Sequence, residues 1–119
     1  MCGIAGIFNK TGTPISEDLV RAMGNAIYHR GPDHQGIWIN QAIGFAHQRL
    51  SIIDTSEAGH QPMHSYDGRY TIVFNGEIYN HNEFRAELNA KGIKLRSNSD
   101  TEVLLYLYIL HGPSILHKL

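Results

Sequence analysis

Two strand-like runs joined by a short turn constrain the fold of this chain more than any other feature. The runs cover residues 36–40 and 43–53, and so short a connection predicts an antiparallel hairpin. Residues 2–9 predict a first strand, and residues 70–75 predict a further strand that ends at Gly76, which permits backbone conformations that other residues avoid. Because segments of helical character lie between these runs, the sequence predicts an α+β fold with antiparallel pairing.

The segment after Ser16 predicts a helix that ends near Tyr28. Serine is a preferred helix-capping residue, and Glu17 and Asp18 would be stabilised by the dipole of the first turn. Five apolar residues recur at helical spacing and form the expected buried stripe of this helix: Leu19, Val20, Met23, Ala26 and Ile27.

Two further helices are predicted by capping boxes, in which a polar residue and a glutamate lie three positions apart: Asn80 with Glu83, and Ser99 with Glu102. We expect Gly92 to end the first of these helices and a short strand to follow near residues 93–96. The second helix covers residues 100–110 and is apolar nearly all round, so we expect other parts of the protein to cover it.

The composition is that of an ordinary globular protein. The chain has 119 residues, enough for one domain, with ten Lys plus Arg against eleven Asp plus Glu. This balance gives no support to nucleic-acid binding. The apolar stretch at residues 4–8 is too short for a signal peptide or a membrane span. We therefore expect a cytoplasmic protein that binds neither nucleic acid nor membrane.

The single cysteine, Cys2, lies directly after the initiator Met1. Most cysteines of cytosolic proteins are inert packing residues, and this is the alternative to a chemical role. Removal of Met1 would leave Cys2 with both a thiol and a free α-amine. An α-amine typically titrates near pH 8, about two units below a lysine, so it can act as a general base near neutrality. Together the two groups would form a self-contained nucleophile and base.

The sequence Asn75-Gly76 follows the predicted strand at residues 70–75. An asparagine NH₂ group and a glycine backbone N–H side by side are the two donors that a tetrahedral oxyanion needs. The alternative is an ordinary Asn-Gly turn between a strand and a helix.

Three charged residues could bind an α-amino acid. Arg49 interrupts a β-like run, and a guanidinium suits a carboxylate; the alternative is a solvent-exposed arginine at a strand edge. Asp100 lies at a predicted helix N-terminus, where an acid is stabilising without any ligand. If Asp100 or Glu77 lay opposite Arg49, the site would bind a carboxylate at one end and an ammonium at the other.

The eight histidines give little support to a metal site. His60 and His64 are four residues apart, but Pro62 lies between them, so a helix is not expected to present them together. We expect no metal site.

Six short segments together resemble the class II glutamine amidotransferases, and two of them, residues 29–33 and 49–54, are similar to asparagine synthetases and their relatives. The segments cover most of the chain and occur in the family's order: MCGIAG at residues 1–6, HRGPD at 29–33, RLSIID at 49–54, GHQP at 59–62, NGEIYN at 75–80 and SDTE at 99–102. The resemblance implies the N-terminal nucleophile (αββα) glutaminase fold, with antiparallel sheets and flanking helices.

The resemblance also implies a role for each matched position. Cys2 would attack the side-chain amide of L-glutamine, with its own α-amine as base, and form a thioester. Asn75 and the N–H of Gly76 would hold the oxyanion. The substrate-binding residues would be these: Arg49 for the carboxylate, Leu50, Ile52 and Ile53 along the pocket, and Glu77 and Asp100 for the ammonium.

In this family the ammonia passes to an ATP-dependent synthetase domain that amidates aspartate or a related acceptor. We expect residues 1–119 to be the N-terminal part of the type-2 amidotransferase domain, incomplete at the C-terminus, with the synthetase domain absent. ATP and Mg²⁺ would belong to that domain, and no cofactor is expected here. Expected partners are L-glutamine, the synthetase domain or a partner chain, and a second copy in a homodimer. The alternative is a non-catalytic binding or assembly module that retains the site.

Overall fold

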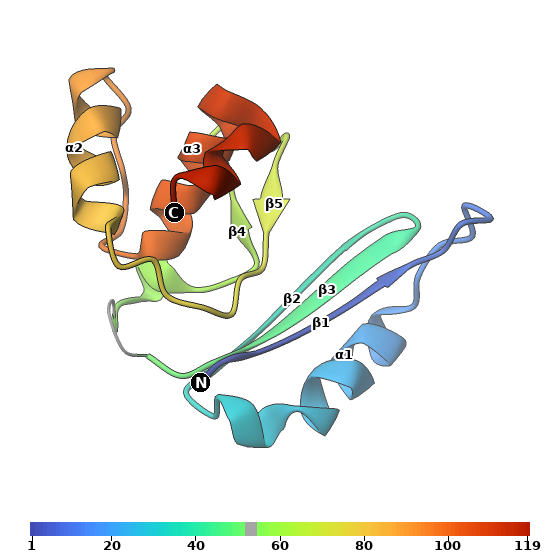
Figure 1. The fold of residues 1–119 in the computed structure, drawn as a ribbon. Helices are drawn as coiled ribbons and strands as arrows, with labels where there is room; N and C mark the ends of the chain where they lie inside the picture. The colour runs from blue at the N-terminus through green and yellow to red at the C-terminus, as the bar shows by residue number, and fades with distance from the viewer. Residues whose placement is uncertain (52–54) are drawn as a thin grey trace. The chain divides into compact units, whose positions relative to one another are not determined.

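The computed structural model describes residues 1–51 and 55–119. These form two compact units, drawn in Figure 1. Unit 1 contains residues 1–51, 60–62 and 73–76, and unit 2 contains residues 55–59, 63–72 and 77–119. Helices and antiparallel strands occur in both units, which confirms the predicted α+β class.

The sheet of unit 1 has three antiparallel strands in the order β1-β3-β2. Their bounds are Gly3–Phe8 for β1, His34–Asn40 for β2 and Ile43–Arg49 for β3. The predicted hairpin is therefore confirmed, although β2 begins two residues earlier than expected and β3 ends at Arg49. Gln41, in the turn, has a φ of 52°, a left-handed conformation that a tight hairpin turn demands.

Alternation along β3 divides its side chains between the two faces of the sheet. Helix α1 (Glu17–Ala26) covers one face. Gln48 of that face donates from Nε2 to the carbonyl of Gly24 at 2.9 Å. A Cβ on Gly44 would lie 2.6 Å from Val20, so the glycine lets the helix approach closely. His47 and Arg49 point to the opposite face of the sheet.

Ser16 caps α1 as predicted, because its Oγ accepts a hydrogen bond from the N–H of Leu19 at 3.4 Å. The helix ends at Ala26, earlier than expected, and a 3-10 helix, η1 (Tyr28–Arg30), follows. The predicted buried stripe is only partly right: Leu19 and Ala26 are exposed. Val20, Met23 and Ile27 of the predicted stripe are buried or half-buried. Gly24, which was not predicted, is also buried, because the helix approaches the sheet closely there.

In unit 2, one helix packs against a second helix and against a two-stranded sheet. Strand β4 (Met63–His64) pairs with β5 (Thr71–Ile72), and the helices are α2 (His81–Ala90) and α3 (Asp100–His111). Two 3-10 helices, η2 (Glu57–Gly59) and η3 (Gly112–His117), complete it. Much of α3 lies in the buried core of this unit, which explains the apolar character of the helix. The core residues are Met63, Leu88, Val103, Leu105, Tyr106, Leu107 and Ile115.

Two strand predictions are wrong: one strand is shorter than expected, and the other does not form. The run at residues 70–75 is a strand only at Thr71–Ile72, because the N–H of Phe74 donates to the Gln61 side chain instead of to a strand. Residues 93–96 do not form a strand, and Arg96 lies in a bend. Their backbone groups are bonded elsewhere: the N–H of Arg96 donates to Glu102 and the carbonyl of Lys94 accepts from a tyrosine hydroxyl.

The predicted capping boxes are half right. Asn80 is the N-cap of α2 but makes no side-chain capping bond. Its Nδ2 donates to the carbonyl of Lys118 at 3.0 Å. Ser99 does cap α3 by accepting from the N–H of Thr101. Glu102 bonds Ser97 rather than Ser99. Gly92, with a φ of 80°, follows the end of α2 as predicted.

Candidate active site

The thiol of Cys2 lies against the backbone of Leu50. The Leu50 N–H donates to Cys2 Sγ at 3.3 Å, and Sγ is 3.5 Å from the Leu50 carbonyl oxygen, to which it donates. Cys2 is half-buried. Met1 is present and exposed, so the Cys2 nitrogen in this structure belongs to a peptide bond. The Cys2 thiol and the predicted pocket residue Leu50 are thus brought together.

Arg49 lies at the end of β3, directly before Leu50. Its side chain is 5% exposed, which excludes the alternative of a solvent-exposed arginine at a strand edge. The ladder of β1 and β3 ends where Gly3 pairs with Gln48. Cys2 and Arg49 are the next residues on the two segments, and the Cys2 thiol bonds the backbone of Leu50, the residue that follows Arg49.

The loop that follows η1 fixes the end of β3. Asp33 Oδ2 accepts a hydrogen bond from the N–H of Ser51 at 2.8 Å, and the Asp33 N–H donates to the Arg49 carbonyl at 3.0 Å. A Cβ on Gly31 would lie 2.5 Å from backbone atoms of Gln48 and Arg49. In the sequence, residues 29–33 stand out only for their family resemblance, and this clamp of β3 by Gly31 and Asp33 was not predicted.

Asn75 and Gly76 belong to unit 1, the unit that contains Cys2. The segment is held by the residue before it: the Phe74 N–H donates to Gln61 Oε1 at 2.6 Å. Gly76 is not among the glycines with a positive φ, so its left-handed freedom is not used. A Cβ there would lie 2.7 Å from the Phe74 ring, and this close approach is the local reason for glycine.

His47, which the sequence reasoning did not select, lies two residues before Arg49 on the same face. Its side chain is fully buried, and neither ring nitrogen has a hydrogen-bond partner among the described residues. Burial lowers the pKa of His47 from 6.5 to about 4, with the Phe74 backbone opposing the change and the positive charge of Arg49 adding to it. The ring is therefore neutral at physiological pH.

The two acids predicted to bind an ammonium, Glu77 and Asp100, belong to unit 2. Asp100 is 5% exposed, and its Oδ2 accepts a hydrogen bond from the N–H of Ile78 at 2.9 Å. The bond joins the N-terminus of α3 to the residue after Glu77, which is itself exposed. Asp100 thus has a structural partner, and its role towards an ammonium group stays a prediction.

Ile52 and Ile53, the remaining predicted pocket residues, lie outside the described residues. Among the residues that are described, no group of three or more His, Cys, Asp or Glu side chains is arranged to hold a metal ion. His60 instead stacks on His34, with ring centroids 3.5 Å apart. No helix in the described ranges is long and apolar enough to cross a membrane.

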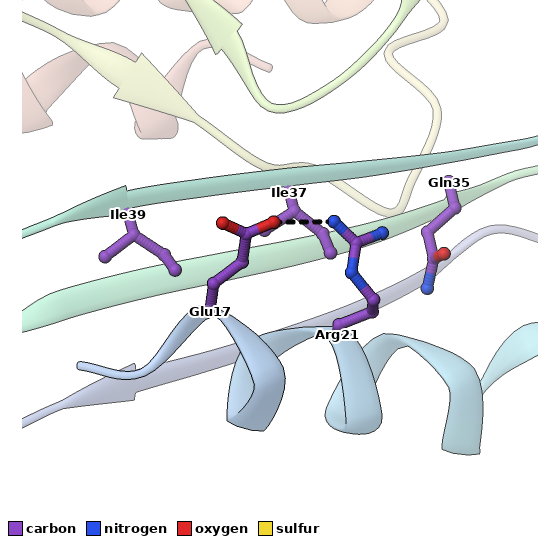
Figure 2. Close-up of a pocket in the computed structure, with 5 residues that line it drawn as sticks. All are labelled: Glu17, Arg21, Gln35, Ile37 and Ile39. Atoms are coloured by element: carbon purple, nitrogen blue, oxygen red, sulfur yellow. Dashed lines mark hydrogen bonds and ion pairs between the residues drawn. The ribbon is translucent and has the colours of Figure 1, made fainter.

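A pocket of about 400 Å³ lies on the other face of the sheet. Figure 2 shows Gln35, Ile37 and Ile39 of β2 lining it beside the exposed ion pair between Glu17 and Arg21 of α1. These β2 positions alternate with the ones that share a face with His47 and Arg49. The pocket is therefore on the α1 side and is separate from the Cys2 thiol.

In a comparison with protein families, the model of the glutamine amidotransferase domain matches residues 1–119. Among curated proteins, the glutamine-hydrolysing asparagine synthetase 1 of Bacillus subtilis (strain 168) is 50% identical over 122 residues, covering 100% of this chain. The glutamine-hydrolysing asparagine synthetase 3 of the same organism is 41% identical over 112 residues, covering 92% of the chain.

A relative with a different name is also similar. The amidase chry2 of Gibberella zeae (strain PH-1) is 36% identical over 132 residues, again covering 100% of the chain. The chain spans 19%, 18% and 19% of the lengths of these three relatives, in the order given. The similarity therefore covers about a fifth of each relative.

Proposed function

Since the chain belongs to the glutamine amidotransferase domain family, we propose that it hydrolyses glutamine to glutamate and ammonia with Cys2 as the nucleophile. The observation that supports this most is the position of the Cys2 thiol. It lies against the backbone of Leu50, the residue that follows the buried Arg49 in the chain. A nucleophile beside a cation that can bind the substrate carboxylate is the arrangement that an amino-acid amidase needs.

The first half of the reaction forms a thioester. After Met1 is removed, the α-amine of Cys2 takes the thiol proton and Sγ attacks the side-chain amide carbon of glutamine. The carbonyl oxygen becomes an oxyanion, which the Asn75 NH₂ group and the Gly76 N–H stabilise. Collapse of this intermediate breaks the C–N bond, and the proton held by the amine goes to the leaving nitrogen, which departs as ammonia.

The second half restores the enzyme. Water gives a proton to the same amine and attacks the thioester carbon, through a second oxyanion at the same donors. The C–S bond then breaks, glutamate leaves and the thiol is regenerated. Binding is assigned to Arg49 for the α-carboxylate, to the pocket of Leu50, Ile52 and Ile53, and to Glu77 and Asp100 for the α-ammonium.

The ammonia would serve an ATP-dependent amidation. The asparagine-synthetase names of two relatives support aspartate as acceptor, and a related acceptor is the alternative. ATP and Mg²⁺ would bind to a synthetase domain and not to residues 1–119. A cytoplasmic location and a homodimer remain parts of the proposal.

Glutamate release by the full 119-residue chain, with Met1 shown by intact mass to be absent, tests the proposal. We expect Cys2→Ala to lower kcat by roughly a thousandfold or more. Arg49→Lys should raise KM for glutamine about ten- to hundredfold, because the planar fork is lost while the charge is kept. Glutamine hydrolysis by Cys2→Ala at the wild-type rate would refute the assignment of the nucleophile.

A further inference from the structure

His47 has buried polar atoms that the reaction described above does not use. The side chain is 0% exposed, and both ring nitrogens lack hydrogen-bond partners among the described residues. A buried polar group without a partner is destabilising and rare. It therefore calls for an explanation in terms of the residues that surround it.

The segment at residues 60–62 crosses the strand next to His47. Gly36 of β2 is paired with His47 in the ladder, and a Cβ on Gly36 would collide with the backbone of Gln61. One residue earlier, the His60 ring stacks on His34 at 3.5 Å between centroids, nearly parallel at 10°. Gln61 is thus fixed beside the buried imidazole.

Gln61 in turn holds the segment that leads to Asn75 and Gly76, the two proposed oxyanion donors. Its Oε1 accepts the hydrogen bond from the Phe74 N–H at 2.6 Å. The Phe74 backbone also favours the protonated state of the His47 ring, and a backbone group has this effect when its carbonyl oxygen faces the imidazole. Phe74 is therefore held by Gln61 and has its backbone near the His47 ring, and Asn75 and Gly76 follow it directly in the chain.

We propose that neutral His47 is a positioning residue for the oxyanion donors of the reaction proposed above. The ring supports the Phe74 backbone, and one ring N–H donates to the Phe74 carbonyl when glutamine binds. Asn75 and Gly76 are thereby aimed at the developing oxyanion. Hydrogen bonds at catalytic sites are often poorly aligned without substrate and improve in the complex, which fits the absence of a well-formed bond here.

The surroundings of His47 keep it neutral. The titratable groups that face it are Arg49 on its own strand, His34 on β2 and His60 in the crossing segment, and all three oppose a positive charge on the ring. Its ladder neighbour on β1 is the apolar Ile4, and residues 73–76 carry no titratable side chain. A neutral imidazole offers one N–H donor and one acceptor, which is what the role requires.

Steady-state glutaminase kinetics of the full chain test this role. We expect His47→Phe, which removes the ring N–H, to lower kcat about ten- to hundredfold, a part of the loss seen when an oxyanion donor is removed. KM for glutamine should stay within about threefold, because Arg49 is untouched. His47→Gln keeps a neutral N–H donor and should recover most of kcat. The exposed His117, changed to Phe and to Gln, is the matched control and should leave both constants unchanged.

Two results would overturn the role: a kcat of His47→Phe within twofold of wild type, or a rise in KM as large as the fall in kcat. A second readout does not depend on activity. In NMR titrations the backbone amides of Asn75 and Gly76 should shift with a midpoint near pH 4, the pKa of His47, and His47→Gln should lack this step. The same step in both proteins would refute the coupling.

The two readouts separate this inference from the proposed function. If wild-type chain shows no hydrolysis that depends on Cys2, the proposed function fails, and the NMR step still decides whether His47 controls the segment. If hydrolysis depends on Cys2 but not on His47, only the positioning role fails.

Discussion

Acid should destabilise unit 1 through His47. The pKa of this histidine is 6.5 in the unfolded chain and about 4 in the folded one. Between these two values the unfolded state binds a proton that the folded state excludes, so stability falls as the pH falls. The slope is about 1.4 kcal/mol per pH unit, and the loss reaches about 3 kcal/mol once the pH is below 4. Above pH 6.5 the contribution is fully present.

Urea unfolding between pH 7 and pH 4.5 measures this loss. The single tryptophan of the chain, Trp38, lies in β2, so its fluorescence reports on unit 1. Wild type should lose about 2–3 kcal/mol more than His47→Gln over this range, because the glutamine does not titrate. The exposed His29→Gln is the control and should behave as wild type. Equal losses in wild type and His47→Gln would refute the reasoning.

Three further substitutions have expected outcomes. Gly31→Ala places a Cβ 2.5 Å from the backbone at Arg49. The free energy of unfolding, measured by Trp38 fluorescence, should therefore fall by about 1–3 kcal/mol. An unchanged free energy would contradict the close packing. Asp33→Asn weakens the hydrogen bond from the Ser51 N–H. KM for glutamine should rise several-fold with kcat nearly unchanged. An unchanged KM would contradict the role of Asp33 in fixing the end of β3. Glu102→Gln disrupts a buried acceptor of two backbone N–H groups and a hydroxyl. The free energy of unfolding of unit 2, followed by helical circular dichroism in urea, should fall by about 1–3 kcal/mol. An unchanged urea midpoint would contradict the role of Glu102 as acceptor.

Local patterns predicted the elements whose partners are close in sequence. The Ser16 cap and the hairpin of β2 and β3 were right because a cap and a two-residue turn depend on neighbouring residues. The strand expected at residues 93–96 was wrong because Glu102 takes the Arg96 N–H. Likewise, the Asn80 side chain makes no capping bond and instead contacts Lys118, 38 residues away. Capping and strand patterns in the local sequence do not include such contacts.

In the candidate site, too, some residues could be predicted from the sequence and others could not. Cys2, Arg49 and Leu50 could be selected from residue chemistry and from resemblance, and the structure brings them together in unit 1. The clamp by Asp33 and the burial of His47 could not be predicted, because both depend on strand register and on segments that cross the sheet. Residue type alone left His47 as one of eight histidines.

The most direct test of the central claim is covalent labelling of Cys2 by a glutamine analogue that carries a diazoketone. Full chain lacking Met1 should gain one adduct by intact mass, mapped to Cys2, at a rate that free glutamine lowers. Chain that retains Met1 is the control and should react much more slowly, because it has no α-amine at Cys2 to act as base. A soluble, folded and processed chain that gains no adduct, or gains one that glutamine does not slow, would contradict the account.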